Sequence, residues 1–338
     1  MESLQALTLK QEKFLTTVKI AITAYVDNKA KFVDEANLMT YSGRGLDGRF
    51  TFVLYAHPEI IDQLDKHINV KIIPYTVPDK QFYRDYGFAK SMVFPYDMPE
   101  PLLEYDYVCK TDTDVFLTPI MNNFPFTDNK IYVGVGNYCH TPGAIEALKQ
   151  AAIKFGYPEY KRIKDMHSTI IGPTKEIINI MRLSDKLEEE MYYGLDSDGE
   201  WGTDVLWRGH LGGNSGVCSM YAMEIVLSSL YNNENLIITD LLDAASEDKR
   251  PWTEVYHMHQ YHHDFIYSKF QAKWGSYLDA EYTNGVTCAE YALNTYISKL
   301  NYIKNKSKFF INHNIYSEPP PENPYWGEGL VFKYRYNQ

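Results

Sequence analysis

Apolar positions in the first third of the chain alternate between two spacings. Residues 19–25, 51–55 and 70–75 are apolar runs rich in β-forming side chains, each short enough for a strand. Residues 29–41 and 58–67, which lie between these runs, repeat their apolar side chains every three or four positions, as amphipathic helices do. The order strand, helix, strand, helix, strand predicts a mostly parallel β-sheet flanked by helices.

The same alternation continues through the rest of the chain. We expect further strands at residues 105–109, 131–135, 168–171 and 254–261, the last of them closing the central sheet. We expect helices at residues 84–94, 142–155, 175–191 and 220–231. The predicted fold class is therefore α/β, with a central mixed sheet flanked by helices. Residues 1–120 and 121–338 are interpreted as two halves of one continuous domain.

Two aspartates directly follow the strand expected at residues 105–109. Asp112 and Asp114 interrupt an otherwise apolar stretch, whereas a second Asp-X-Asp triplet, at residues 196–198, lies among glycines and acids. Two like charges on one side of the chain bring no packing advantage, but Mg²⁺ or Mn²⁺ prefers such oxygen ligands. Because ligands of open α/β sheets bind beyond the carboxyl ends of the strands, the pair predicts a metal site there. A structural acid pair is the alternative.

The segment around this pair resembles a known superfamily. Residues 104–117, EYDYVCKTDTDVFL, resemble the central strand and Asp-X-Asp motif of GT-A-fold glycosyltransferases. Residues 168–173, STIIGP, are similar to the acceptor-side strand of that superfamily, and residues 200–204, EWGTD, are similar to its acidic segment at the reacting centre. The resemblance extends over most of the chain and implies a GT-A-like fold.

The resemblance also implies an activity and its partners. The activity would be transfer of a sugar from a nucleoside diphosphate, UDP or GDP, to a hydroxyl group of a glycan or other acceptor, with Mn²⁺ or Mg²⁺ as cofactor. The half at residues 1–120 would bind the nucleotide-sugar donor. The half at residues 121–338 would bind the acceptor and carry the catalytic groups, and it would end in an extended tail.

Individual roles follow from the resemblance. Asp114 would bind the metal, and Asp112 would contact the sugar or the ribose as well as the metal. The nucleotide would be bound at the end of the first strand and in the helix before the motif, by Thr23, Ala24, Tyr25, Arg84 and Lys90. Of the two basic residues we prefer Lys90. Surface helices often carry basic side chains without a ligand, so both have an equally strong structural interpretation.

The resemblance assigns the catalytic carboxylate to Glu200 or Asp204. In an inverting enzyme such a group would deprotonate the acceptor hydroxyl, and in a retaining enzyme it would stabilise positive charge at the anomeric carbon. We favour Asp204, and helix capping by either residue is the alternative.

Four histidines lie within seven residues, at positions 257, 259, 262 and 263. On a strand, His257 and His259 share one face. Several retaining GT-A enzymes complete the metal site with a histidine late in the chain, so the resemblance implies His257 or His259 as a metal ligand and favours retention. Packing or surface imidazoles are the structural alternative. A His-X-His pair also occurs in zinc-dependent hydrolases, which makes a hydrolase using His257 and His259 the rival function.

Charge, composition and one glycine motif disfavour several other classes of protein. The net charge of −11 disfavours nucleic acid as a partner, since that binding depends on Lys and Arg. The chain has no apolar run of about 18 residues and no signal-peptide pattern, so we expect no transmembrane segment and a cytoplasmic enzyme. Gly134-Val-Gly136 follows a strand, but Cys139 stands where a dinucleotide-binding loop needs its third glycine. A GT-A-like protein that binds glycan or nucleotide without turnover is a further alternative.

Overall fold

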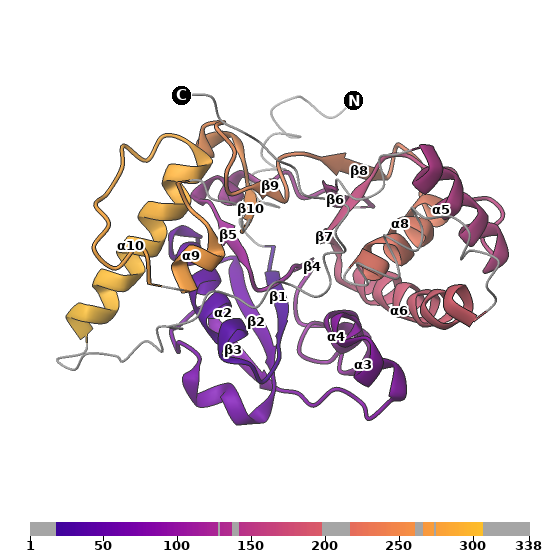
Figure 1. Cartoon of the computed structure of the whole chain (residues 1–338), viewed down its shortest axis with the longest axis horizontal. Coiled ribbons are helices and arrows are strands. Elements are labelled where there is room, and N and C mark those ends of the chain that lie inside the picture. The colour runs from indigo at the N-terminus through magenta and orange to yellow at the C-terminus, as the bar shows by residue number, and fades with distance from the viewer. Residues whose placement is uncertain are drawn as a thin grey trace, which may run out of the picture.

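A mixed β-sheet forms the centre of the molecule (Figure 1). The computed structural model describes residues 18–127, 129–136, 142–197, 217–260, 266–273 and 275–306. Seven strands pair in the order β3-β2-β1-β4-β7-β6-β8. Their bounds are β1 Ile20–Val26, β2 Phe50–Ala56, β3 Val70–Pro74, β4 Tyr107–Lys110, β6 Ile131–Val135, β7 Met166–Pro173 and β8 Leu236–Thr239.

One strand of this sheet runs against the others. β1 is parallel to both β2 and β4, and β2 is parallel to β3. β7 is antiparallel to β4 on one side and to β6 on the other, while β6 is parallel to β8. The prediction of an α/β fold with a mixed central sheet is confirmed. The sheet takes strands from both sides of residue 120.

Helices cover both faces of the sheet, because its strands are apolar on both faces. Alternate side chains of β1 and β2 enter two separate cores, with Ala21 and Val53 in one and Ile22 and Phe52 in the other. The first core is closed by α3 Gln81–Asp85, α4 Lys90–Asp97, α5 Pro142–Lys154, α6 Thr174–Ser197 and α8 Cys218–Leu230. The second core is closed by α2 Ala30–Ser42, by β5 Val115–Leu117 and by residues 121–126.

A second, three-stranded sheet lies beside the carboxyl end of β4. It consists of β5 Val115–Leu117, β10 His257–His259 and β9 Ala244–Ala245, in the order β5-β10-β9. β10 is antiparallel to β5 and parallel to β9. A third core joins this sheet to α9 Lys269–Lys273 and α10 Cys288–Lys306, and α10 also packs against α2. In Figure 1 α9 and α10 lie on the side of the molecule opposite to α5, α6 and α8.

Several expectations need correction. The strand expected at residues 254–261 is only three residues long and belongs to the second sheet, where β5 is its partner, so it does not close the central sheet. The helix expected at residues 58–67 is a 3₁₀-helix, Pro58–Gln63, whose hydrogen bonds from Ile60 to His57 and from Leu64 to Ile61 span three residues. The helix expected at residues 84–94 is divided between α3 and α4. β8 and α10 were not expected from the sequence.

None of the helices in the described part of the chain is both long enough and apolar enough to cross a membrane.

Candidate metal centre

Asp112 and Asp114 lie in the connection between β4 of the central sheet and β5 of the second sheet. β4 lies between β1 and β7 and ends at Lys110, and β5 begins at Val115. The two aspartates occupy the connection, at the carboxyl end of a central parallel strand. Their side chains are 30% and 16% exposed, respectively, although the strands on either side of them are buried.

The pairing of β10 with β5 brings His259 to this connection. His259 is the register partner of Val115, and the backbone N–H of Gln260 donates to the carbonyl of Asp114 at 2.8 Å. Nε2 of His259 lies 3.6 Å from Oδ2 of Asp114. Asp112, Asp114 and His259 each offer one ligand atom, and these atoms all lie within 4.8 Å of one another. Two carboxylates and an imidazole at this spacing could hold one divalent cation.

Charges around Asp114 keep it ionised. Burial alone would raise the pKa of Asp114, but Lys269 and His259 outweigh it and hold the pKa well below its ordinary range. Nζ of Lys269 donates to Oδ2 of Asp114 at 2.6 Å. Burial would lower the pKa of His259, but Asp114 and Asp243 raise it to about 9. The site is therefore a close-packed set of opposite charges.

A buried lysine supports the other aspartate. Lys110 is the last residue of β4 and its side chain is 3% exposed. Its Nζ lies 3.5 Å from Oδ1 of Asp112. The carboxylate pair is thus neutralised from one side by Lys110 and from the other by Lys269.

His257 has a different environment from His259, although both belong to β10. It is fully buried, and burial lowers its pKa to about 4. Its Nδ1 accepts from the backbone N–H of Asp243 at 3.2 Å, and its Nε2 lies 2.9 Å from Oγ1 of Thr111. Since both ring nitrogens have protein partners, we leave His257 out of the proposed metal ligands. Neither of the two metal-compatible groups among the described residues contains it.

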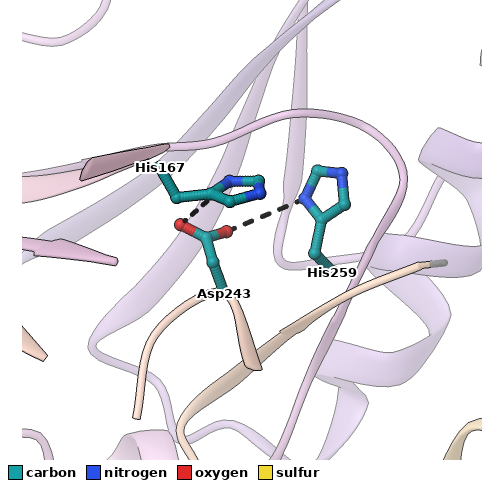
Figure 2. Close-up of side chains that lie close together, drawn as sticks. All are labelled: His167, Asp243 and His259. Carbon is teal, nitrogen blue, oxygen red and sulfur yellow. Dashed lines mark ion pairs between the residues drawn. The ribbon is translucent and has the colours of Figure 1, made fainter. Parts of the chain in front are cut away.

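The second of these groups consists of His167, Asp243 and His259. His167 comes from β7, and Asp243 immediately precedes β9 (Figure 2). His259 belongs to both groups, with Nδ1 on the side of Asp243 and Nε2 on the side of Asp114.

Of the residues expected to bind the nucleotide, some are buried inside the sheet and others have exposed surface. Thr23 and Ala24 are completely buried in β1, where the Thr23 hydroxyl donates to the carbonyl of Val53 at 2.7 Å. Tyr25 and Lys90 meet at Asp27 instead: the Tyr25 hydroxyl lies 3.3 Å from Oδ1, and Lys90 Nζ lies 3.2 Å from Oδ2. Tyr25 is only partly buried, so it is the member of the β1 triplet placed to contact a ligand.

The hydrogen-bond partners of Arg84 are not those of Tyr25 and Lys90. Its guanidinium pairs with Asp79 and Gln81, within the same short stretch of chain, and its side chain is 54% exposed. Glu200 and Asp204 lie outside the described residues.

Four residues around the centre were not expected from the sequence, namely His167, Asp243, Lys269 and Glu35. Glu35 is a buried α2 residue that accepts from the Thr113 hydroxyl at 3.1 Å and from Lys273 Nζ at 2.7 Å. Each of Glu35 and Asp243 has other acids close by in sequence, so neither stood out as a candidate. His167 adjoins the strand expected at residues 168–171, and Lys269 had no local signal.

The chain was compared with protein-family models and with curated proteins. No curated protein matches the chain. A family model does match, over residues 57–315, which is more than half of the chain and includes every proposed metal ligand. Its description is "Domain of unknown function (DUF7164)". The protein described here, with its mixed sheet and acidic, histidine-containing centre, belongs to the DUF7164 family.

Proposed function

We propose that this protein is a metal-dependent glycosyltransferase of the GT-A type, which transfers a sugar from a nucleoside diphosphate to a hydroxyl group. One observation carries the proposal: Asp112, Asp114 and His259 converge at the carboxyl end of β4 with their ligand atoms within 4.8 Å of one another. A mixed α/β sheet with this group beyond a central strand supports it, because such sheets bind ligands at that edge.

The ligand types fit the proposed metal. Carboxylate oxygens suit Mg²⁺ and Mn²⁺ alike, whereas an imidazole nitrogen is a softer ligand that favours a transition metal. We therefore expect Mn²⁺ to bind more tightly than Mg²⁺ at Asp112, Asp114 and His259. A bound metal would neutralise negative charge on the diphosphate as the bond between sugar and phosphate breaks.

Protein side chains near the centre suit an anionic donor. Lys269 is partly buried against Asp114, and its ammonium would also attract the diphosphate. Tyr25 and Lys90, joined through Asp27, offer an aromatic face and a cation for the base and the ribose. Asp112, held near Lys110, would contact the sugar as well as the metal.

The proposed reaction makes one bond and breaks another. The acceptor oxygen bonds to the anomeric carbon, the bond from that carbon to the phosphate oxygen breaks, and the nucleoside diphosphate leaves. The acceptor hydroxyl must lose its proton to a base, and Glu200 and Asp204 are our candidates for the catalytic carboxylate. The histidine in the metal group is the feature that favours retention of configuration.

Donor binding and turnover test the proposal. The full chain would be titrated with UDP- and GDP-sugars by thermal shift, with Mn²⁺ and with EDTA, since a ligand that binds only the folded state raises its melting temperature. We expect a rise that needs both Mn²⁺ and a donor and that disappears in Asp114→Ala. The control Asp62→Ala alters an exposed carboxylate outside the site and should behave as the wild type. Absence of any metal-dependent donor binding would overturn the proposal.

Release of nucleoside diphosphate separates an enzyme from a binding protein. We expect slow metal-dependent hydrolysis of the preferred donor even without acceptor, and its loss in Asp204→Asn or Glu200→Gln with donor binding retained. Binding without release in the presence of a broad acceptor panel would favour a GT-A-like binding protein instead.

The His167, Asp243 and His259 group favours a second candidate, the zinc-dependent hydrolase. A shift in melting temperature with Zn²⁺ alone, but with no nucleotide-sugar, would support this candidate. The proposed transferase predicts the opposite dependence on the nucleotide.

A further inference from the structure

Asp243 is a buried carboxylate surrounded by histidines and a threonine. Its side chain is completely buried. Oδ2 accepts from the backbone N–H of Thr169 at 3.1 Å, and Oδ1 accepts from the Thr169 hydroxyl at 2.7 Å. His167 Nδ1 lies 3.5 Å from Oδ2, and His259 Nδ1 lies 3.8 Å from Oδ1 (Figure 2). Burial would raise the pKa of Asp243, but its histidine neighbours hold that pKa far below the ordinary range.

The surrounding backbone is shaped to admit this carboxylate. Asp243 has φ of 54°, a left-handed conformation that non-glycine residues rarely adopt. Gly134 in β6 provides the space beside it, because a Cβ at that position would lie 2.1 Å from Oδ2 of Asp243. Gly134-Val-Gly136 thus lets a side chain approach β6.

Asp243 is poorly placed to be a metal ligand itself. Both of its oxygens accept hydrogen bonds from Thr169, and its side chain is completely buried, whereas those of Asp112 and Asp114 are partly exposed. Its Oδ1 lies 3.3 Å from Nδ1 of His257 and 3.8 Å from Nδ1 of His259, and of these two histidines only His259 belongs to the metal group.

We propose that Asp243 is a positioning residue that fixes the His259 ring so that Nε2 faces the metal bound by Asp112 and Asp114. Nδ1 of His259 faces Asp243, and Nε2 lies 3.6 Å from Oδ2 of Asp114 on the other side of the ring. A carboxylate that accepts from one nitrogen of a histidine leaves the other nitrogen for the metal and makes it a better ligand. This inference rests on the proposed metal site, and so on the proposed function.

His167 completes the support. Its ring centroid lies 4.6 Å from that of His259, and its Nδ1 faces the second oxygen of Asp243. Asp243 is thereby held between β7 and β10, and rotation of the His259 ring is restricted by a neighbouring ring as well as by the carboxylate.

Mn²⁺ binding by full-length Asp243→Asn tests the proposal, with Mn²⁺ alone as the probe and calorimetry as the measurement. Outer-shell changes of this kind typically weaken metal binding about 10- to 100-fold, and we expect a loss in that range. The wild type should bind one Mn²⁺. The matched control is Asp185→Asn. Asp185 is a buried aspartate that accepts hydrogen bonds from the hydroxyls of Tyr83 and Tyr96, and the variant should keep the wild-type affinity.

A spectroscopic measurement separates positioning from a general effect on folding. In the Zn²⁺-loaded wild type, nitrogen-15 NMR of the histidines should show His259 bound through Nε2 and protonated at Nδ1. Asp243→Asn should alter this signature while circular dichroism remains that of the wild type. If Asp243→Asn does not fold, Thr169→Val removes one hydrogen bond to Oδ1 and should lower Mn²⁺ affinity at least threefold.

The outcomes distinguish this inference from the proposed function. Equal affinity of wild type and Asp243→Asn for Mn²⁺ would overturn the positioning role and leave the metal site intact. Two Mn²⁺ per wild-type chain and one in the variant would overturn it too, since Asp243 would then be a ligand. No Mn²⁺ binding by the wild type would overturn both.

Discussion

Nζ of Lys269 lies 2.6 Å from Oδ2 of Asp114, the same oxygen that faces Nε2 of His259. In this structure the protein's own ammonium therefore neutralises the carboxylate that we assign to the metal. A metal that binds there must compete with this ammonium, and a diphosphate that arrives with the metal would give the ammonium a new partner. Lys269 should thus oppose binding of the bare metal and support binding of the metal with its nucleotide.

Replacement of Lys269 by Met should move these two affinities in opposite directions. Affinity for Mn²⁺ alone should rise several-fold, because a competing charge is gone. Affinity for the nucleoside diphosphate in the presence of Mn²⁺ should fall about tenfold, as expected for loss of one charge-assisted hydrogen bond. Calorimetric titrations measure both. Lys273→Met is the control, since that ammonium contacts Glu35. A fall in both affinities would contradict the proposed competition.

The two histidines of β10 should respond differently to substitution. His259→Ala should lower Mn²⁺ affinity at least tenfold, because its Nε2 faces Asp114 in the metal group. His257→Ala should lower the free energy of unfolding by about 2 kcal/mol, since it removes the acceptor of the buried backbone N–H of Asp243. Mn²⁺ titration and urea unfolding measure the two quantities. A larger loss of metal affinity in His257→Ala than in His259→Ala would contradict our ligand assignment.

Substitution of Lys90 and of Arg84 should have different effects on nucleotide binding. Lys90→Met should weaken binding of the nucleoside diphosphate, because Lys90 lies with Tyr25 at Asp27. Arg84→Met should leave it unchanged, because the partners of Arg84 are local and its side chain is largely exposed. Equilibrium titration with UDP and GDP in Mn²⁺ measures both variants. A stronger effect of Arg84→Met would contradict the position assigned to the nucleotide.

The central sheet was predictable because its strands carry strong local patterns. β1 and β2 are almost continuously buried, and the helix that separates them repeats its apolar positions with helical spacing. β8 has four residues, of which only Leu236 is fully buried, so its pattern is too short and too weak to read. β10 has a pattern that fits any three-residue strand, and only its pairing with β5 decides to which sheet it belongs.

Some residues of the candidate site could be identified from local sequence, and others are brought together only by the fold. Asp112 and Asp114 are neighbours in sequence, and a strand precedes them, so local context identifies the pair. His167 and Asp243 are far apart in sequence and meet only because β7 and the segment before β9 pack together. Their proximity depends on the tertiary fold. The space left by Gly134 depends on it as well.

Gly134→Ala should disturb Asp243 without any change at that residue. Gly134 does not have a positive φ, so alanine suits its backbone, and the obstacle is the 2.1 Å approach of the new Cβ to Oδ2 of Asp243. We expect a loss of about 1–3 kcal/mol in the free energy of unfolding, as for other overpacked sites, together with weaker Mn²⁺ binding. Urea unfolding and Mn²⁺ titration measure these effects. Gly87→Ala is the control, because a Cβ there meets nothing within 4 Å.

The double variant Gly134→Ala/Asp243→Gly identifies the cause. Asp243→Gly removes the carboxylate that the new Cβ would meet and suits the positive φ at position 243, so Gly134→Ala should cost little stability when it is added to Asp243→Gly. Metal affinity should remain low, because the carboxylate is absent. Recovery of metal affinity would contradict the role that we give to Asp243.

Lys299 offers a test of stability away from the site. It is 8% exposed in α10, its Nζ donates to the carbonyl of Asp34 at 3.3 Å, and burial lowers its pKa to about 8. Below pH 8 the ammonium is charged in both the folded and the unfolded chain, and the folded chain bears the cost of burying it. Between pH 8 and about 10.5 only the unfolded chain stays protonated, so this group's contribution to stability rises with pH.

Lys299→Met should therefore be more stable than the wild type at pH 7. The shift of the pKa from 10.5 to about 8, at about 1.4 kcal/mol per pKa unit, sets an upper limit of about 3.5 kcal/mol on the gain. The gain should shrink as the pH rises from 8 to 10, because the wild-type lysine becomes neutral in the folded chain. Urea unfolding at pH 7 and pH 10 measures it, with Lys304→Met as the control, since Lys304 is exposed on the same helix. A pH-independent difference between Lys299→Met and the wild type would show that packing, and not the buried charge, determines the effect, because only the charge changes over this range.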